Sequence, residues 1–144
     1  VTSVELAVAG KVLFSVQIAQ RSGRLEASLP APWPSGLLID GLNDLLASKM
    51  EALVSRGAPR DFRDVHAVCE AALVDVGELW GLWKRRREAA GEAADGRNAA
   101  LAVRTHLERI ERVRPLEKIA DLGQREAARA LRAWFKEHFL AGLV

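Results

Sequence analysis

The sequence predicts an α+β fold, in which a β-hairpin or partial sheet in residues 1–40 precedes a bundle of about five helices in residues 41–144. Two observations support this class. Before residue 20, apolar residues alternate with a period of two, which is typical of strands with one buried face. After residue 41, apolar residues recur every three or four positions, which is typical of helices packed on one side.

The first two strands are predicted to form a hairpin. Two apolar alternations flank Gly10-Lys11, and a short link that starts at glycine favours a tight turn. The alternating positions are Val4, Leu6, Val8, Val12, Phe14, Val16 and Ile18. Residues 20–36 are rich in Ser, Pro and Gly and predict a loop, and residues 36–39 predict one more short strand. Because so few strands leave unpaired edges, we expect this β portion to complete a larger sheet, to pair between subunits or to lie flat on the helices.

Five helices are predicted from their apolar faces and from the residues at their ends. The end signals are Gly57, Pro59, the Asp75–Glu78 capping-box pair, a break at residues 91–96 and Pro115. The apolar faces are Leu42, Leu46, Met50 and Leu53; Phe62, Val65, Cys69 and Ala72; Leu79, Trp80 and Trp83; Val103, Leu107 and Ile110; and Ala128, Leu131, Phe135 and Phe139. We expect the aromatic side chains on these faces to fill the core of the bundle.

The composition is that of an ordinary soluble domain. The chain has 144 residues and a formal net charge of +2, which by itself does not indicate nucleic-acid binding. Its single cysteine excludes an intrachain disulfide, so we expect a reducing, cytoplasmic location. No apolar run approaches the roughly 20 residues that span a bilayer, and no signal peptide is visible, so we expect no membrane partner.

A cluster of charged residues interrupts the apolar pattern of the first two predicted helices. Lys49 has apolar neighbours three and four positions away, so its ammonium requires an anionic partner. Asp61 and Asp64 share one face of the next helix and are the candidate partners, and Arg56 and Arg60 lie close by in sequence. Two interpretations stay open: an ion pair that fixes how the helices dock, or a cavity for a phosphorylated ligand. If Lys49 is buried, Lys49→Ala should lower the free energy of unfolding by about 1–3 kcal/mol.

This charged pattern resembles that of the AbiEii/AbiGii family of nucleotidyltransferase toxins. In that family an acidic residue precedes a lysine by five positions, and an apolar helix, an arginine and an Arg-Asp-x-x-Asp sequence follow. The matching positions here are Asp44, Lys49, Arg56, Arg60, Asp61 and Asp64. Asp44 is a mild departure, because the family usually has glutamate there. The resemblance is good over residues 36–70 and faint over residues 1–20, where residues 3–6 look like a family strand with one acidic residue.

The resemblance implies a role for each of these residues. Lys49 would contact the nucleotide phosphates, with Arg56 and Arg60 as further nucleotide-binding residues. Asp64 would activate the acceptor, and Asp61 beside it is a second catalytic candidate. The family also implies an NTP substrate, an antitoxin and, in some members, RNA as the acceptor.

The family's first motif is a Gly-Ser pair followed by Asp-x-Asp, whose carboxylates hold magnesium. Neither sequence occurs in these 144 residues, and Glu5 is the remaining candidate metal ligand. We therefore expect the chain, which begins at Val1, to be a truncated, C-terminal portion of such a toxin that is inactive alone, with magnesium bound only in the complete enzyme. The alternative is a stand-alone degenerate relative that binds a ligand or a protein without chemistry. Such a relative could form a homodimer through an exposed strand edge.

Two further patterns are weaker. His66 and Cys69 share a helical face, but two ligands do not make a structural zinc site. The basic run from Lys84 to Arg87 falls at the end of a predicted helix, where the helix dipole favours cations. A solvated helix end and a nucleic-acid contact both remain open for this run.

Overall fold

The computed structural model describes residues 2–18, 23–34 and 36–141, and it confirms the predicted α+β class. A hairpin of β1 (Thr2–Val8) and β2 (Lys11–Ile18) is followed by a short ribbon of β3 (Leu29–Pro30) and β4 (Leu38–Ile39). The regular elements after this ribbon are all helices. Their bounds are α1 Leu42–Ser55, α2 Pro59–Glu70, α3 Val76–Ala89, α4 Gly96–Val113, the 3-10 helix η1 Leu116–Lys118, α5 Leu122–Trp134 and the π-helical turn η2 Phe135–Phe139.

The hairpin forms as the alternating pattern predicts. β1 and β2 are antiparallel, with Leu6 opposite Phe14 and a register shift directly after Leu6. Ala9 and Gly10 form the turn, and their φ angles of 50° and 76° are the positive values that a tight hairpin turn requires. The predicted strand near residue 38 also forms, and it pairs with β3 inside the segment that was predicted to be a loop.

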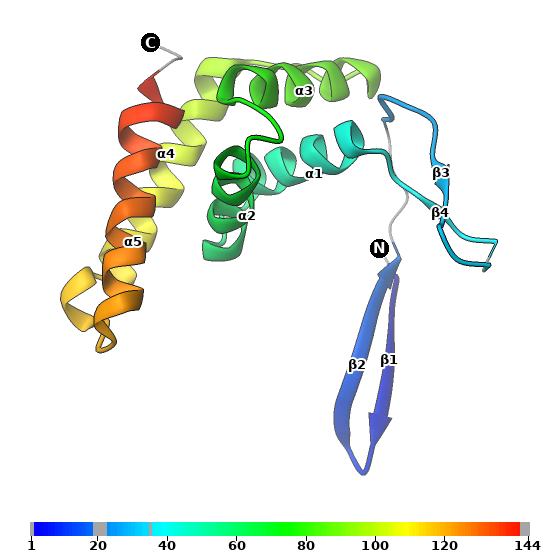
Figure 1. The fold of residues 1–144 in the computed structure, drawn as a ribbon, viewed down its shortest axis with the longest axis horizontal. Helices are drawn as coiled ribbons and strands as arrows, with labels where there is room; N and C mark the ends of the chain where they lie inside the picture. The colour runs from blue at the N-terminus through cyan, green and yellow to red at the C-terminus, as the bar shows by residue number, and fades with distance from the viewer. Residues whose placement is uncertain (1, 19–22, 35, 142–144) are drawn as a thin grey trace.

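The apolar face of the hairpin is exposed. Val4, Leu6 and Phe14 are 54%, 59% and 61% exposed. Figure 1 shows that β1 and β2 extend away from the helices, so the expectation that they lie flat on the helical body is wrong. Completion of a larger sheet and pairing between subunits stay predictions for these strands.

The core lies around α1, which contacts α2, α3 and α4 (Figure 1). Leu46, Met50 and Leu53 of α1 are at most 2% exposed, as their spacing predicts. The aromatic side chains fill the core as expected, and the rings of Phe62 and Phe135 meet edge-on with 4.7 Å between their centroids. Burying each such large apolar side chain contributes about 1.5–3 kcal/mol.

Aspartates begin three of the helices. Asp75, Asp95 and Asp121 each accept a hydrogen bond from a backbone N–H in the first turn of α3, α4 and α5. The first of these caps was predicted, and the other two were not. The predicted second helix was too long, because α2 ends at Glu70 and Ala72 lies in a turn with a φ angle of 53°.

Candidate functional site

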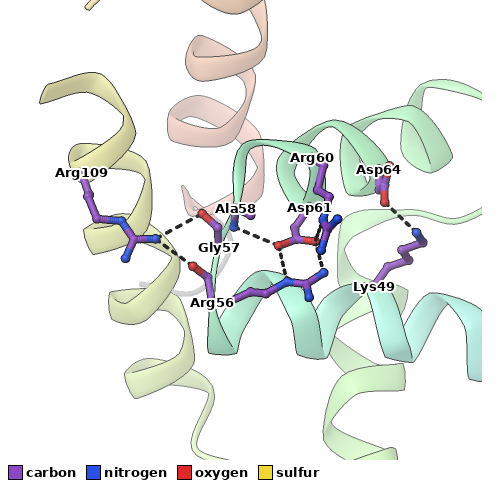
Figure 2. A network of polar contacts seen from close by, with 8 residues as sticks. All are labelled: Lys49, Arg56, Gly57, Ala58, Arg60, Asp61, Asp64 and Arg109. Carbon is purple, nitrogen blue, oxygen red and sulfur yellow. Dashed lines mark hydrogen bonds and ion pairs between the residues drawn. The ribbon is translucent and has the colours of Figure 1, made fainter. Parts of the chain in front are cut away.

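The charged cluster lies where α1 turns into α2. Gly57 follows α1 with a φ angle of 51°, a conformation that residues with side chains rarely adopt. Pro59 then occupies the first turn of α2, as predicted. This short connection lets α2 contact α1, so Lys49 on α1 points towards Asp64 on α2 (Figure 2). The structure thereby brings together two of the residues that the motif singled out.

Lys49 and Asp64 form a partly exposed ion pair. Lys49 Nζ lies 2.6 Å from Asp64 Oδ2, and the two side chains are 38% and 39% exposed. Lys49 thus has the anionic partner that was expected, but it is not buried, because a long lysine stem can lie along an apolar surface while its ammonium stays near water. A pair this exposed contributes about 0–1 kcal/mol to stability. The ammonium and the carboxylate both remain accessible to a ligand.

Asp61 is buried, with 2% exposure, and its carboxylate is saturated with donors. It accepts hydrogen bonds from Arg56 Nε at 2.9 Å, from Arg56 Nη2 at 2.8 Å and from the backbone N–H of Ala58 at 2.9 Å (Figure 2). Arg60 Nε lies 4.0 Å from the same carboxylate. The hydrogen bonds from Arg56 hold the pKa of Asp61 below its ordinary value despite burial, and they raise the pKa of Arg56. Asp61 thus ties the end of α1 to the start of α2.

The lowered pKa of Asp61 predicts a pH-dependent stability. Its stabilising effect is complete above the pKa of about 4 in the unfolded chain and is lost as the pH falls through the lower folded value. We expect the urea midpoint, followed by circular dichroism, to fall as the pH is lowered below about 4, and to fall less in Asp61→Asn. An equal fall in both proteins would assign the acid sensitivity to other carboxylates.

Two side chains of α4 close the α1–α2 turn from the other side. Arg109 Nη2 donates to the carbonyl oxygen of Arg56 at 2.8 Å (Figure 2), and His106 Nε2 lies 3.1 Å from the carbonyl oxygen of Val54. These contacts engage carbonyls at the end of α1, where the helix itself supplies no donor. Sequence reasoning missed both side chains, because they come from a helix about 50 residues away and belong to no local motif.

Asp44 has a structural role that the motif comparison did not predict. It is 2% exposed, and its carboxylate accepts the backbone N–H groups of Leu25 and Glu26, each at 3.1 Å. Glu26 in turn accepts the backbone N–H of Asn43 at 3.0 Å. The acidic residue five positions before Lys49 therefore fastens the chain before β3 to the first turn of α1.

Two residues of the basic run in α3, Arg86 and Arg87, contact α1. Arg86 Nη1 donates to the carbonyl oxygen of Asp44 at 3.2 Å, and Arg87 pairs with Glu51 at 3.3 Å. The indole N–H of Trp83 donates to the same Glu51 carboxylate at 3.0 Å. Neither a solvated helix end nor a nucleic-acid contact accounts for these two arginines, because their donors hold α3 against α1.

Glu5, the candidate metal ligand, lies apart from the α1–α2 junction. It is exposed in β1 opposite Ser15, on a hairpin that extends away from the helices (Figure 1). Among the described residues, no three His, Cys, Asp or Glu side chains converge as metal ligands. Asp61 is buried and already accepts three hydrogen bonds from Arg56 and Ala58, and Asp64 is paired with Lys49. The carboxylates in the described ranges therefore do not fit a magnesium site by themselves.

His66 and Cys69 have separate packing environments. The His66 ring packs edge-on against Trp134, with 4.8 Å between the ring centroids. Burial raises the pKa of the Cys69 thiol, and a thiol with a raised pKa is a poor metal ligand.

A sequence model of one protein family matches most of the chain. Its description is nucleotidyl transferase AbiEii toxin, Type IV TA system, and it matches residues 20–142. The chain belongs to the AbiEii family. The match contains Lys49, Asp64 and the turn between them, whereas the β1–β2 hairpin with Glu5 precedes it. No curated protein and no solved structure matches the chain.

Membership of the AbiEii family sets the coarse functional class, a relative of nucleotidyltransferase toxins of toxin–antitoxin systems. Nucleotidyltransferases of this family generally use magnesium. None of the helices in the described part of the chain is long and apolar enough to span a membrane.

Proposed function

We propose that this AbiEii chain supplies the phosphate-binding and acceptor-activating side of a nucleotidyl transfer site. The accessible Lys49–Asp64 ion pair is the observation that supports this most. The ammonium can bind a phosphate, and the carboxylate beside it can accept a proton. The buried contact between Asp61 and Arg56 supports the pair, because it holds the two helices that carry it in a defined arrangement.

In this proposal Lys49 binds the phosphates of an NTP. Phosphate oxygens then compete for the ammonium and release Asp64, whose carboxylate accepts the proton of the acceptor hydroxyl. The hydroxyl oxygen attacks the α-phosphorus, and pyrophosphate leaves. Arg56 and Arg60, which are 53% and 66% exposed, add positive charge for the phosphates. Asp61 acts as a positioning residue, since its contacts hold Arg56 and the first turn of α2.

Magnesium, when bound, would offset phosphate charge. The described carboxylates are not arranged to hold it, and the 144 residues contain no Gly-Ser pair and no Asp-x-Asp sequence. We therefore propose that this chain transfers no nucleotide by itself. Glu5 would contribute to a metal site only beside carboxylates from elsewhere.

Lys49→Ala is expected to weaken NTP binding about 10- to 100-fold, the effect of losing one charge-assisted hydrogen bond. Isothermal titration with ATP and GTP measures this loss. The same substitution should change the free energy of unfolding by less than about 1 kcal/mol, because the pair is exposed to water. Lys84→Ala is the matched control, since Lys84 forms an exposed pair with Glu88 on α3 at 3.9 Å and should affect neither quantity.

Two outcomes would contradict the proposal. Equal NTP affinities in wild type, Lys49→Ala and Lys84→Ala would remove the phosphate-binding role of Lys49. Magnesium-dependent transfer of radiolabel from an α-labelled NTP by the chain alone would remove the proposed inactivity. That second result would also require metal-binding carboxylates that the present arrangement does not show.

A second function is that of a stand-alone relative that binds a ligand or protein without chemistry. The 2.6 Å separation favours it, because Lys49 and Asp64 satisfy one another's charge. In that case the titrations would show no NTP binding in any of the three proteins.

The partners and the location are proposals as well. An NTP substrate and an antitoxin fit the Type IV family description. An RNA acceptor fits the exposed arginines at the junction, and a homodimer fits the unpaired edges of the hairpin. A cytoplasmic location is proposed from the single, free Cys69.

A further inference from the structure

α5 is an amphipathic helix whose apolar face is only partly buried. Among Leu122–Trp134 only one residue, Arg132, is buried. An amphipathic helix in a globular domain normally buries its apolar stripe against a core. The apolar side chains Ala128 and Leu131 border a groove and are only partly buried, so the described residues leave part of this stripe uncovered.

The groove is large and has an apolar floor. Its volume is about 1300 Å³, and it is lined by residues of α2, α4, η1 and α5. Phe62, Ile110 and Leu131 contribute to the floor, and Val113 at the end of α4 lines the groove while 70% exposed. An amphipathic helix can bind in a groove that is lined by apolar side chains of several helices.

Cations without partners surround this floor. Arg63 on α2, Arg114 at the end of α4 and Lys118 in η1 all line the groove, and their side chains form no ion pair or hydrogen bond within the described residues. Two carboxylates also line it. Glu70 lies 3.8 Å from His66 Nδ1, and Asp121 caps α5 through the backbone N–H of Gln124. The groups of the groove that remain available to a partner are therefore mainly cations.

We propose that this groove docks an acidic amphipathic helix of a partner protein. The apolar stripe of that helix would cover Ala128 and Leu131, and its carboxylates would pair with Arg63, Arg114 and Lys118. The groove residues of α2 lie on the side of the helix opposite Asp61, which faces α1 (Figure 2). The inference therefore goes beyond the proposed function and does not rest on it.

The lining favours a protein helix over a nucleic acid. Single-stranded nucleic acids are held mainly by exposed aromatic platforms together with cations. In this groove Phe62 is 1% exposed, and the His66 ring already packs against Trp134.

Binding of designed helical probes to the full chain tests this inference. The main probe is a fluorescein-labelled peptide of about 16 residues, with leucine at helical spacing and glutamate on its other face. The matched probes are the same peptide with lysine in place of glutamate, a scrambled glutamate peptide and a single-stranded RNA oligonucleotide. Fluorescence anisotropy should show binding of the ordered glutamate peptide and at least about tenfold weaker binding of the other three.

Variants assign the binding to the groove. Arg114→Glu with Lys118→Glu should weaken binding of the glutamate peptide at least about tenfold, because the cationic rim is reversed. Arg112→Glu is the matched control, since Arg112 is exposed on α4 outside the groove lining and should leave binding within about twofold. Circular dichroism of each variant checks that the helices remain folded.

Several results would overturn the inference. One is absence of binding by the glutamate peptide, and another is equal binding in wild type and the double variant. Preference for the RNA would assign the groove to nucleic acid. Self-association of the chain that the double variant abolishes would assign it to a second copy. None of these outcomes changes the NTP titrations, so failure here is distinguishable from failure of the proposed function.

Discussion

Asp61→Ala is expected to lower the free energy of unfolding by about 3 kcal/mol. The carboxylate is 2% exposed and accepts two hydrogen bonds from Arg56 and one from the backbone N–H of Ala58. Its removal takes away a helix cap, worth about 1 kcal/mol, and a charge-assisted bidentate contact. Arg56 is 53% exposed, so water can solvate it in the variant and keeps the loss at the lower end of the range for broken buried pairs.

Urea denaturation followed by circular dichroism measures this loss, with Asp64→Ala as the matched control. Asp64 lies three positions later on the same helix, but its pair with Lys49 is exposed, so we expect a loss below about 1 kcal/mol. Similar losses in the two variants would show that burial does not distinguish the two aspartates. A loss below about 1 kcal/mol for Asp61→Ala would show that the junction does not depend on its carboxylate.

Gly57→Ala is expected to lower the free energy of unfolding by about 2–4 kcal/mol. The φ angle of Gly57 is 51°, which costs a residue with a side chain about 1–2 kcal/mol. A Cβ at this position would also lie 2.4 Å from Cβ of His106, so α4 would have to move away from the end of α1. That movement would weaken the contacts of His106 with Val54 and of Arg109 with Arg56.

Gly91→Ala separates these two causes. Gly91 has a φ angle of 74°, but a Cβ there would meet no atom within 4 Å, so we expect only the conformational cost of about 1–2 kcal/mol. The difference between the two denaturation midpoints reports the contact between α4 and the α1–α2 turn. If the two glycines respond equally, the close approach of His106 contributes nothing measurable.

Much of the fold could be predicted from short-range patterns. The alternation around Gly10 predicted the hairpin and its turn, because strand pairing across a tight turn depends on neighbouring residues. Gly57 and Pro59 marked the end of α1 and the start of α2 for the same local reason. The caps Asp95 and Asp121 were missed, although an aspartate before an apolar-periodic run is a recognised start signal.

The candidate site was predicted as a set of residues but not as an arrangement. The spacing of Lys49, Asp61 and Asp64 showed that two carboxylates follow one lysine, and either could have been its partner. The crossing of α2 over α1 decided that Lys49 pairs with Asp64 in partial contact with water, while Asp61 is buried against Arg56. Burial depends on which helices pack together, and no single helix carries that information.

The sequence by itself determined the α+β class, the helix ends around Gly57 and the resemblance to the AbiEii family, which the family match confirms. These follow from local backbone preferences and from residue types at fixed spacing. Only the tertiary structure decided that Arg109 and His106 close the α1–α2 turn and that α5 leaves a groove with a cationic rim. Such contacts join segments that are distant in sequence, so they depend on packing geometry that no local pattern specifies.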